Sequence, residues 1–94
     1  MFIATFRSKS LRQFAASGST KGLPVQNGTK LEALLDIIKG CADADAFLSV
    51  PRGRPHRLTG DRADTYAISV TANWRLTFRI EDEKVTDLDL EDYH

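Results

Sequence analysis

Residues 66–90 read YAISVTANWRLTFRIEDEKVTDLDL, and this stretch decides the fold. Apolar and polar residues alternate over 66–70 and again over 74–80, which is the pattern of strands with one buried face. Asn73 lies in the two-residue connection between these runs and tolerates a left-handed backbone, and the acidic EDEK that follows makes a second turn. With a last strand over 85–90, the stretch predicts an antiparallel meander with one apolar face.

The first half of the chain predicts two helices. Ser8 or Ser10 can N-cap a helix over 9–17, and Gly18 can end it. Pro24 suits the first turn of a second helix, which Gly40 can terminate. Its apolar residues recur at helical spacing and are Leu31, Leu34, Leu35 and Ile38.

These helices must bury their apolar faces on the sheet, because neither the helices nor the sheet can shield its apolar face from water alone. A short strand over 2–7 precedes them. A chain of 94 residues is large enough for one core and too small for two. We therefore expect a single domain over 1–94 of the α+β class, with two N-terminal helices packed on one face of an antiparallel β-sheet.

Composition predicts a cytoplasmic protein without membrane association. Hydrophobic residues make up 41% and charged residues 28%, and no apolar run approaches the roughly 20 residues of a membrane span. The opening MFIATFRSKS has its apolar residues before its basic ones, the wrong order for a signal peptide. Cys41 is the single cysteine, so an internal disulfide is excluded and a reducing compartment is expected.

The net charge is zero, but its distribution is uneven. Residues 1–79 carry twelve Lys and Arg against six acids, whereas residues 80–94 carry seven acids and one Lys. Two interpretations stay open: an acidic edge strand paired with a basic neighbour across the sheet, or a basic groove elsewhere on the molecule.

Strand alternation places Arg75 and Arg79 on the face of the sheet opposite the apolar residues. If the apolar residues of 74–80 point at the helices, Arg75 and Arg79 point to the opposite, open face. Four further arginines fall within 52–62, a segment broken by Gly and Pro that predicts a loop or an irregular edge segment. Guanidinium groups match phosphate geometry, so this loop beside the open face is either a phosphate-tracking surface or a solvated basic loop.

Candidate proton-transfer groups are His56, inside that loop, and the closing run Asp92-Tyr93-His94. Alone, each has an ordinary alternative, a surface histidine and a frayed chain end. The two histidines and the scattered acids have no metal-ligand spacing, so we expect no metal and no cofactor.

Several segments together resemble a known family: Phe6, Lys9, Leu11 and Phe14; Gly18–Gly22; His56–Asp61; Tyr66–Val70; Asn73–Arg79; and Asp92-Tyr93-His94. Over nearly its whole length the chain is similar to the HigB branch of the RelE toxin superfamily. The combination of NWR-x-x-F-R with a terminal DYH is the more specific part. The resemblance implies a toxin of a type II toxin–antitoxin system that cuts mRNA on the ribosome.

The resemblance also implies the site residues. Catalytic positions are His56, Arg75, Asp92, Tyr93 and His94, and RNA- or ribosome-binding positions are Arg52, Arg54, Arg57, Thr59, Asn73 and Arg79. Attack of the RNA 2′-OH on the adjacent phosphate needs a base, an acid and positive charge, and no metal. Arg75 would supply the charge, His94 or Asp92 the base, and His56 the acid or a phosphate ligand. Tyr93 would stack on or orient the nucleobase.

Two features depart from the family. Thr59 stands three residues after His56, where many relatives carry a lysine, so Arg57 or Arg54 would have to supply the missing charge. The near-zero net charge is also low for such a toxin. Both features fit slow or weak toxicity.

Partners and alternatives follow from the same resemblance. It implies a cognate helix-turn-helix antitoxin, mRNA on the ribosome, and operator DNA bound only through the antitoxin complex. A ParE-like gyrase inhibitor on the same scaffold is one alternative, because fold does not fix function. A weakly active or inactive module that only binds antitoxin is the other.

Overall fold

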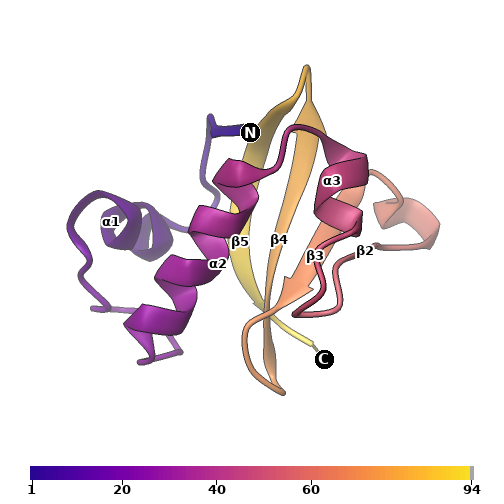
Figure 1. The fold of residues 1–94 in the computed structure, drawn as a ribbon. Coiled ribbons are helices and arrows are strands. Elements are labelled where there is room, and N and C mark those ends of the chain that lie inside the picture. The colour runs from indigo at the N-terminus through magenta and orange to yellow at the C-terminus, as the bar shows by residue number, and fades with distance from the viewer. Residues whose placement is uncertain (94) are drawn as a thin grey trace.

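The computed structural model describes residues 1–93, and the prediction for His94 lies outside them. Five strands form one sheet in the order β1-β5-β4-β3-β2 (Figure 1). All neighbours are antiparallel except β1, which runs parallel to β5. The strands are β1 (Phe2–Ile3), β2 (His56–Arg57), β3 (Thr65–Ser69), β4 (Trp74–Glu81) and β5 (Lys84–Asp92). The predicted meander of three strands is confirmed as β3, β4 and β5.

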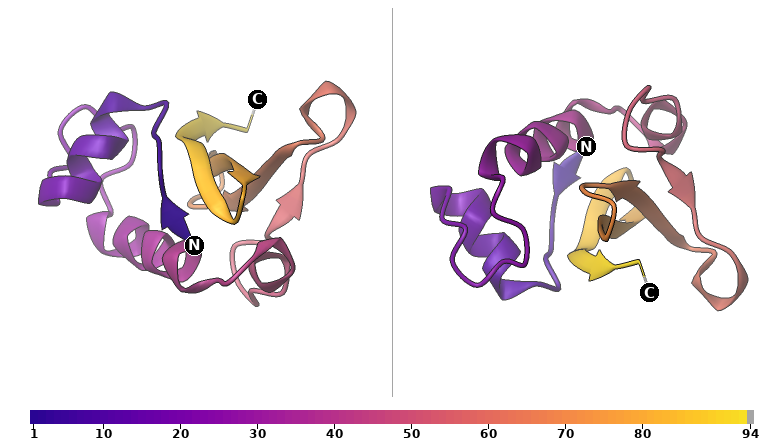
Figure 2. Two further views of the ribbon diagram at one scale, coloured as in Figure 1. Left: turned by 90° about the horizontal axis from the view of Figure 1, so that it is seen from above. Right: turned by 90° about the horizontal axis from the view of Figure 1, so that it is seen from below.

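The helices lie on one side of this sheet, and the end of the described chain lies on the other (Figure 2). They are α1 (Lys9–Ser17), α2 (Gly28–Gly40) and α3 (Ala44–Leu48). In α1, the Ser8 side chain accepts a hydrogen bond from the Leu11 amide, and Gly18 adopts φ 78°, as predicted from the sequence. The α+β architecture is therefore confirmed. None of the described helices is long and apolar enough to cross a bilayer.

Two predicted boundaries were wrong. The second helix does not begin at Pro24, because the side chain of Asn27 accepts the Lys30 amide and makes position 27 the N-cap. The first strand is not continuous over 2–7: two residues pair with β5, and Phe6 makes a single further bridge to Leu88.

The sequence patterns missed α3, which is too short to be stable alone. Asp43 caps its start through the Ala46 amide, at 2.9 Å. Phe47 holds the helix on the sheet, because its ring is fully buried and meets Phe78 edge to face at a centroid distance of 4.9 Å. Burying such a ring contributes about 2–3 kcal/mol.

A β-bulge in β5 sets which residues enter the core. Thr77 pairs with Asp89, yet Arg79 pairs with Thr86, so β5 contains one extra residue. Asp87 takes φ 53° at this point. The bulge lets Val85 and Leu88, three residues apart, both be fully buried, which strict alternation would forbid. Residues with no exposed side chain include Leu11, Leu31, Ile38, Phe47, Ile68, Leu76, Val85 and Leu88.

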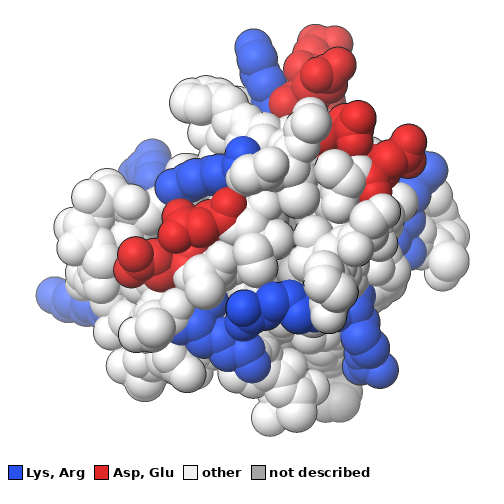
Figure 3. Space-filling view, in the orientation of Figure 1, with Lys and Arg blue, Asp and Glu red and all other residues white. Residues whose placement is uncertain are grey.

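Charges are unevenly spread over the helix-covered face, which carries a second acidic patch at its left in Figure 3. Acidic side chains gather at the end of the sheet that carries the β4–β5 turn, which contains the exposed residues Glu81, Asp82 and Glu83. Lysine and arginine side chains form a band across the opposite half of this face. The half that is rich in cations also carries the β3–β4 connection and the end of β5 (Figure 1).

Candidate active site

His56 lies on β2, a two-residue strand at the edge of the sheet, which agrees with the edge-segment alternative of the sequence analysis. It pairs with Ala67 of β3, which in turn pairs with Thr77 of β4. Its Nδ1 lies 2.8 Å from the Arg54 carbonyl oxygen. Because a carbonyl can only accept, this contact requires a proton on Nδ1 and leaves Nε2 for chemistry.

The turn that delivers His56 depends on Gly53. Gly53 and Arg54 both have positive φ, 73° and 48°, so the chain reverses sharply before β2. The Gly53 carbonyl accepts the Ser69 amide at 2.7 Å, which fixes the turn to the end of β3. A Cβ at position 53 would lie 2.5 Å from Cγ1 of Ile68, so only glycine fits.

Tyr93, the last described residue, is held at three points. Its amide donates to the Asn73 carbonyl at 2.9 Å, and its hydroxyl shares a short hydrogen bond with the Ser69 hydroxyl. Its ring centroid lies 5.1 Å from the guanidinium carbon of Arg75. The described end of the chain is therefore bound to both β3 and β4 rather than frayed.

A cavity of about 370 Å³ joins these parts. Its lining residues are Arg54, Pro55, His56 and Tyr93. Tyr93 belongs to this cavity and also touches Arg75, so it connects the imidazole side of the site with the guanidinium side. Residues more than thirty positions apart in sequence thus form one site on the open face of the sheet.

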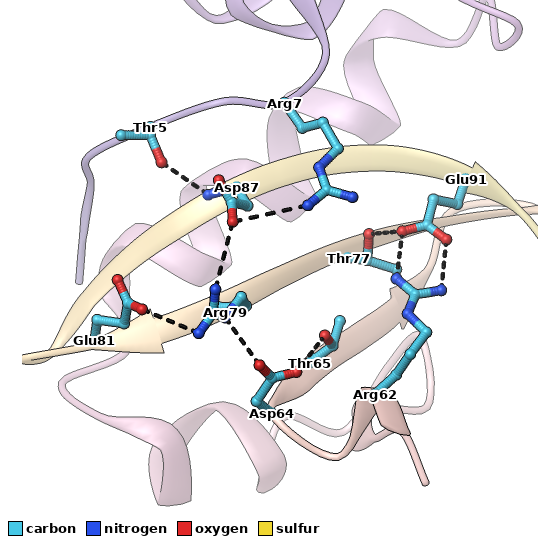
Figure 4. A network of polar contacts seen from close by, with 10 residues as sticks. All are labelled: Thr5, Arg7, Arg62, Asp64, Thr65, Thr77, Arg79, Glu81, Asp87 and Glu91. Atoms are coloured by element: carbon cyan, nitrogen blue, oxygen red, sulfur yellow. Dashed lines mark hydrogen bonds and ion pairs between the residues drawn. The ribbon is translucent and has the colours of Figure 1, made fainter. Parts of the chain in front are cut away.

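Two predicted binding arginines lie elsewhere. Arg57 follows His56 and points to the opposite face, where its guanidinium donates to the Ala63 carbonyl and lies 5.6 Å from the Tyr66 ring centroid. Arg79 does share the open face, but three carboxylates surround it (Figure 4). These are Asp64, Glu81 and Asp87, at 3.1, 3.2 and 3.8 Å.

Arg75 and Arg79 share the open face as predicted, but carboxylates offset the charge of Arg79 there. The acidic last strand pairs with cations, as one of the two charge interpretations proposed, but it is not an edge strand, because β1 pairs with it on its other side. Arg7 also reaches Asp87, at 3.9 Å, and Arg62 binds Glu91 through two hydrogen bonds of 2.9 and 2.7 Å (Figure 4). Arg75, by contrast, forms no ion pair within residues 1–93.

The pKa of Glu91 reflects its ion pair with Arg62. Hydrogen bonds from Arg62 lower the pKa of Glu91 to about 2, partial burial opposes this shift, and a short hydrogen bond from the Thr77 hydroxyl adds to it. The same contact raises the pKa of Arg62. Glu91 is consequently ionised at neutral pH.

The remaining predicted positions are less closely joined to the cavity. Asp92 pairs with Trp74 on neighbouring strands, so its Cβ points to the face opposite Arg75. Asn73 contributes its backbone carbonyl to Tyr93. Arg52 lines a separate cavity with Lys30, and Thr59 is exposed before the 3₁₀ turn η1 (Gly60–Arg62).

Sequence reasoning missed Ser69, Glu91 and Arg62. Ser69 and Glu91 are the two cross-strand neighbours of Arg75. Alternation places Ser69 on the open face, but its partner could be read only from the hairpin register. No local pattern indicates the Arg62–Glu91 pair, because the two residues lie 29 positions apart. Within residues 1–93, no group of three or more His, Cys, Asp or Glu side chains could hold a metal ion.

Comparison with protein families decides where this arrangement belongs. A family of RelE-like toxins of the type II toxin–antitoxin system HigB matches residues 4–94. The match includes every residue that lines the cavity. The chain belongs to the HigB-like toxin family. It is accordingly the toxin member of such a system, and an antitoxin is its partner.

Individual relatives agree with this membership. This HigB-like toxin is 33% identical to the endoribonuclease HigB of Proteus vulgaris over 92 residues, which is 98% of this chain and 99% of the relative. The fold is similar to the YoeB/ParE toxin from Agrobacterium tumefaciens, with a TM-score of 0.64 at 17% identity and full coverage of both chains. YafQ from Escherichia coli gives 0.61 at 14% identity, covering 97% of this chain and 93% of YafQ.

The YoeB–YefM toxin–antitoxin heterotetramer from Staphylococcus aureus is a third structural relative of this HigB-like toxin. The TM-score is 0.62 at 16% identity, with 100% of this chain and 99% of the matched chain covered. At these identities the likeness establishes the shared fold. The family membership rests on the match over residues 4–94 and on the Proteus relative.

Proposed function

We propose that this HigB-like toxin is a ribosome-dependent endoribonuclease that cuts mRNA. The observation that carries the proposal is Tyr93, which lines the His56 cavity and also lies against the Arg75 guanidinium. An imidazole and a guanidinium joined through one aromatic ring can supply two of the three groups that metal-free phosphodiester cleavage needs, an acid and a positive charge. The 33% identical Proteus relative, an endoribonuclease, supports this reading.

In this reaction the 2′-oxygen attacks the adjacent phosphorus, and the bond from phosphorus to the 5′-oxygen breaks. A base removes the 2′-OH proton, an acid protonates the departing 5′-oxygen, and a 2′,3′-cyclic phosphate remains. The pentacoordinate phosphorane carries extra negative charge, which a preorganised guanidinium stabilises. Arg75 takes this role, because it forms no ion pair within residues 1–93 and its guanidinium lies against Tyr93 of the cavity.

His56 is the proposed general acid. Its Nδ1 contact with the Arg54 carbonyl fixes the ring and leaves Nε2 to face the leaving oxygen. Arg54 shares the cavity and is the proposed replacement for the lysine missing at Thr59. Tyr93 would orient the nucleobase by stacking. We assign the base to His94, because Asp92 pairs with Trp74 on the other face of β5.

Charge supports contact with RNA at this end of the molecule. Arg52 and Lys30 line a neighbouring cavity of about 290 Å³ on the far side of Gly53. Both side chains are exposed, and cations along a path of phosphates contribute affinity without reading sequence. Arg57 and Arg79 are left out of the proposed binding surface, because protein acceptors already occupy them.

The test is cleavage of a defined mRNA on purified ribosomes, mapped by primer extension. Codon-phased cuts that leave 5′-OH ends, persist in EDTA and vanish in Arg75→Ala support the proposal. Arg7→Ala is the matched control, since it removes an exposed arginine remote from the cavity and should cleave normally. Intact mRNA together with inhibited DNA gyrase would favour the ParE-like alternative. No effect in either assay would favour a module that only binds antitoxin.

We propose further that the antitoxin is a helix-turn-helix protein, through which the complex reaches operator DNA. The zero net charge gives the toxin alone little affinity for DNA, which supports operator binding through the antitoxin, and the helix-turn-helix fold is what the family resemblance implies. Co-purification of the product of the adjacent reading frame, followed by a gel-shift on the upstream DNA, tests it. The complex should shift the DNA, and the toxin alone should not.

A further inference from the structure

Glu91 lies directly across the strand pair from Arg75. The two residues are partners in the β4–β5 register, so their side chains leave the same face of the sheet next to one another. In such a position an opposite-charge pair is the ordinary outcome. A carboxylate bound to Arg75 would cancel the positive charge that a phosphate needs.

The structure gives Glu91 a different partner. Arg62, from the 3₁₀ turn η1, donates to both carboxylate oxygens, at 2.9 and 2.7 Å (Figure 4). The Thr77 hydroxyl donates to the same carboxylate. A two-pronged guanidinium contact satisfies a carboxylate with well-defined geometry. The Glu91 carboxylate is therefore already bound by Arg62, a residue of the 58–64 segment.

Arg75 is correspondingly left with an aromatic partner. Its guanidinium lies 5.1 Å from the Tyr93 ring centroid, and its buried Nε has no acceptor among residues 1–93. A ring face attracts a cation without neutralising it. Of Arg62, Glu91 and Arg75, only Arg75 has no ion pair within residues 1–93, although its charge already helps to lower the pKa of Glu91.

We propose that Arg62 is a positioning residue that holds Glu91 away from Arg75, so that the Arg75 guanidinium stays available for the scissile phosphate. This inference rests on the proposed function, which assigns Arg75 to that phosphate. Glu91 is ionised at neutral pH with or without Arg62, because the ordinary carboxyl pKa of 4.5 already lies well below 7. Its negative charge therefore attracts the guanidinium that lies nearest to it. Without Arg62, the neighbouring cation is Arg75.

The experiment compares Arg62→Ala, Glu91→Gln and the double variant in the ribosome cleavage assay. Arg62→Ala should lower kcat about tenfold or more, because Glu91 then pairs with Arg75. Glu91→Gln alone should stay within about threefold of wild type, since it removes the competing charge and keeps the shape. The double variant should recover to the level of Glu91→Gln. Arg62→Lys should fall between Arg62→Ala and wild type.

Equal losses in Arg62→Ala and the double variant would overturn the inference, because Arg62 would then matter only for folding. Full activity in Arg62→Ala would overturn it as well. Melting temperatures report folding of every variant. If Arg62→Ala does not fold, Arg62→Lys with and without Glu91→Gln provides the same comparison.

A readout independent of activity separates this inference from the proposed function. The ¹⁵N-bound Nε proton of Arg75 should exchange more slowly with water in Arg62→Ala, where it gains a carboxylate partner, and return to the wild-type rate in the double variant. An unchanged exchange rate would overturn the inference even if the chain cleaves mRNA. If Arg75→Ala cleaves normally, the proposed function fails, and the exchange rates still decide whether Arg62 controls the Arg75–Glu91 contact.

Discussion

The ring of Tyr93 lies 5.1 Å from the guanidinium carbon of Arg75, and the Tyr93 hydroxyl bonds to Ser69, the cross-strand neighbour of Arg75. One side chain near the end of the chain thus touches two central strands at once. The same side chain lines the cavity with His56. This contact makes the site a property of the folded sheet rather than of any one segment.

The first prediction concerns the two contacts of Tyr93. Tyr93→Phe removes the hydroxyl bond to Ser69 and keeps the ring over Arg75, so cleavage should fall by about fivefold, the worth of one hydrogen bond. Tyr93→Ala removes both and should cost at least about a hundredfold, because base stacking is lost as well. Single-turnover cleavage rates measure both. Equal effects of the two variants would show that the ring contributes nothing.

A second prediction decides which arginine replaces the lysine absent at Thr59. Arg54 lines the His56 cavity, whereas Arg57 bonds to Ala63 on the other face. Arg54→Ala should therefore lower kcat/KM about tenfold, as expected for one lost charged contact to phosphate. Arg57→Ala should act mainly on stability, through its loop contact. The reverse ranking in steady-state cleavage would contradict this placement of the phosphate.

Gly53 gives a prediction about stability. Gly53→Ala puts a methyl group 2.5 Å from Cγ1 of Ile68 at φ 73°, so the free energy of unfolding should fall by about 1–3 kcal/mol. Gly40→Ala is the control, because nothing lies within 4 Å of its Cβ and its φ is not in the left-handed region. That variant should be neutral or slightly more stable. Urea unfolding of both proteins measures the difference, and equal stabilities would rule out the strained turn.

The fourth prediction is a pH dependence from Glu91. Its pKa is lowered from 4.5 to about 2 in the folded chain, so the unfolded chain takes up this proton first as pH falls. The stabilisation is complete above pH 4.5 and is lost between 4.5 and about 2. Solvent screening of the pair limits it to about 1–2 kcal/mol.

Unfolding measured at several pH values tests this contribution. Wild type should exceed Glu91→Gln in stability at pH 7, and the gap should close as the pH approaches 2. Glu83→Gln, at the exposed β4–β5 turn, is the control and should show no such gap. A gap that is constant with pH would mean that the ionised carboxylate is not the source of the stability.

The features that could be predicted from the sequence are those that depend on residues close together in the chain. Alternation over 66–70 and 74–80 reflects the two-residue period of a strand, and the stripe of α2 reflects the helical period, so both layers of the fold were predicted correctly. The caps of α1 at Ser8 and Gly18 depend on neighbouring amides alone. The position of α3 could not be predicted, because a five-residue helix exists through the burial of Phe47.

By itself the sequence determined which residue types the chain can bring to a phosphate, and which face of β4 carries Arg75. Tertiary structure alone decided which cations stay uncompensated, because ion pairs such as Arg62–Glu91 join segments 29 positions apart. It also decided that Arg79 is surrounded by carboxylates while Arg75 meets an aromatic ring. Charge pairing depends on distance in space, and that distance is set by strand register, by the bulge at Asp87 and by the turn at Gly53.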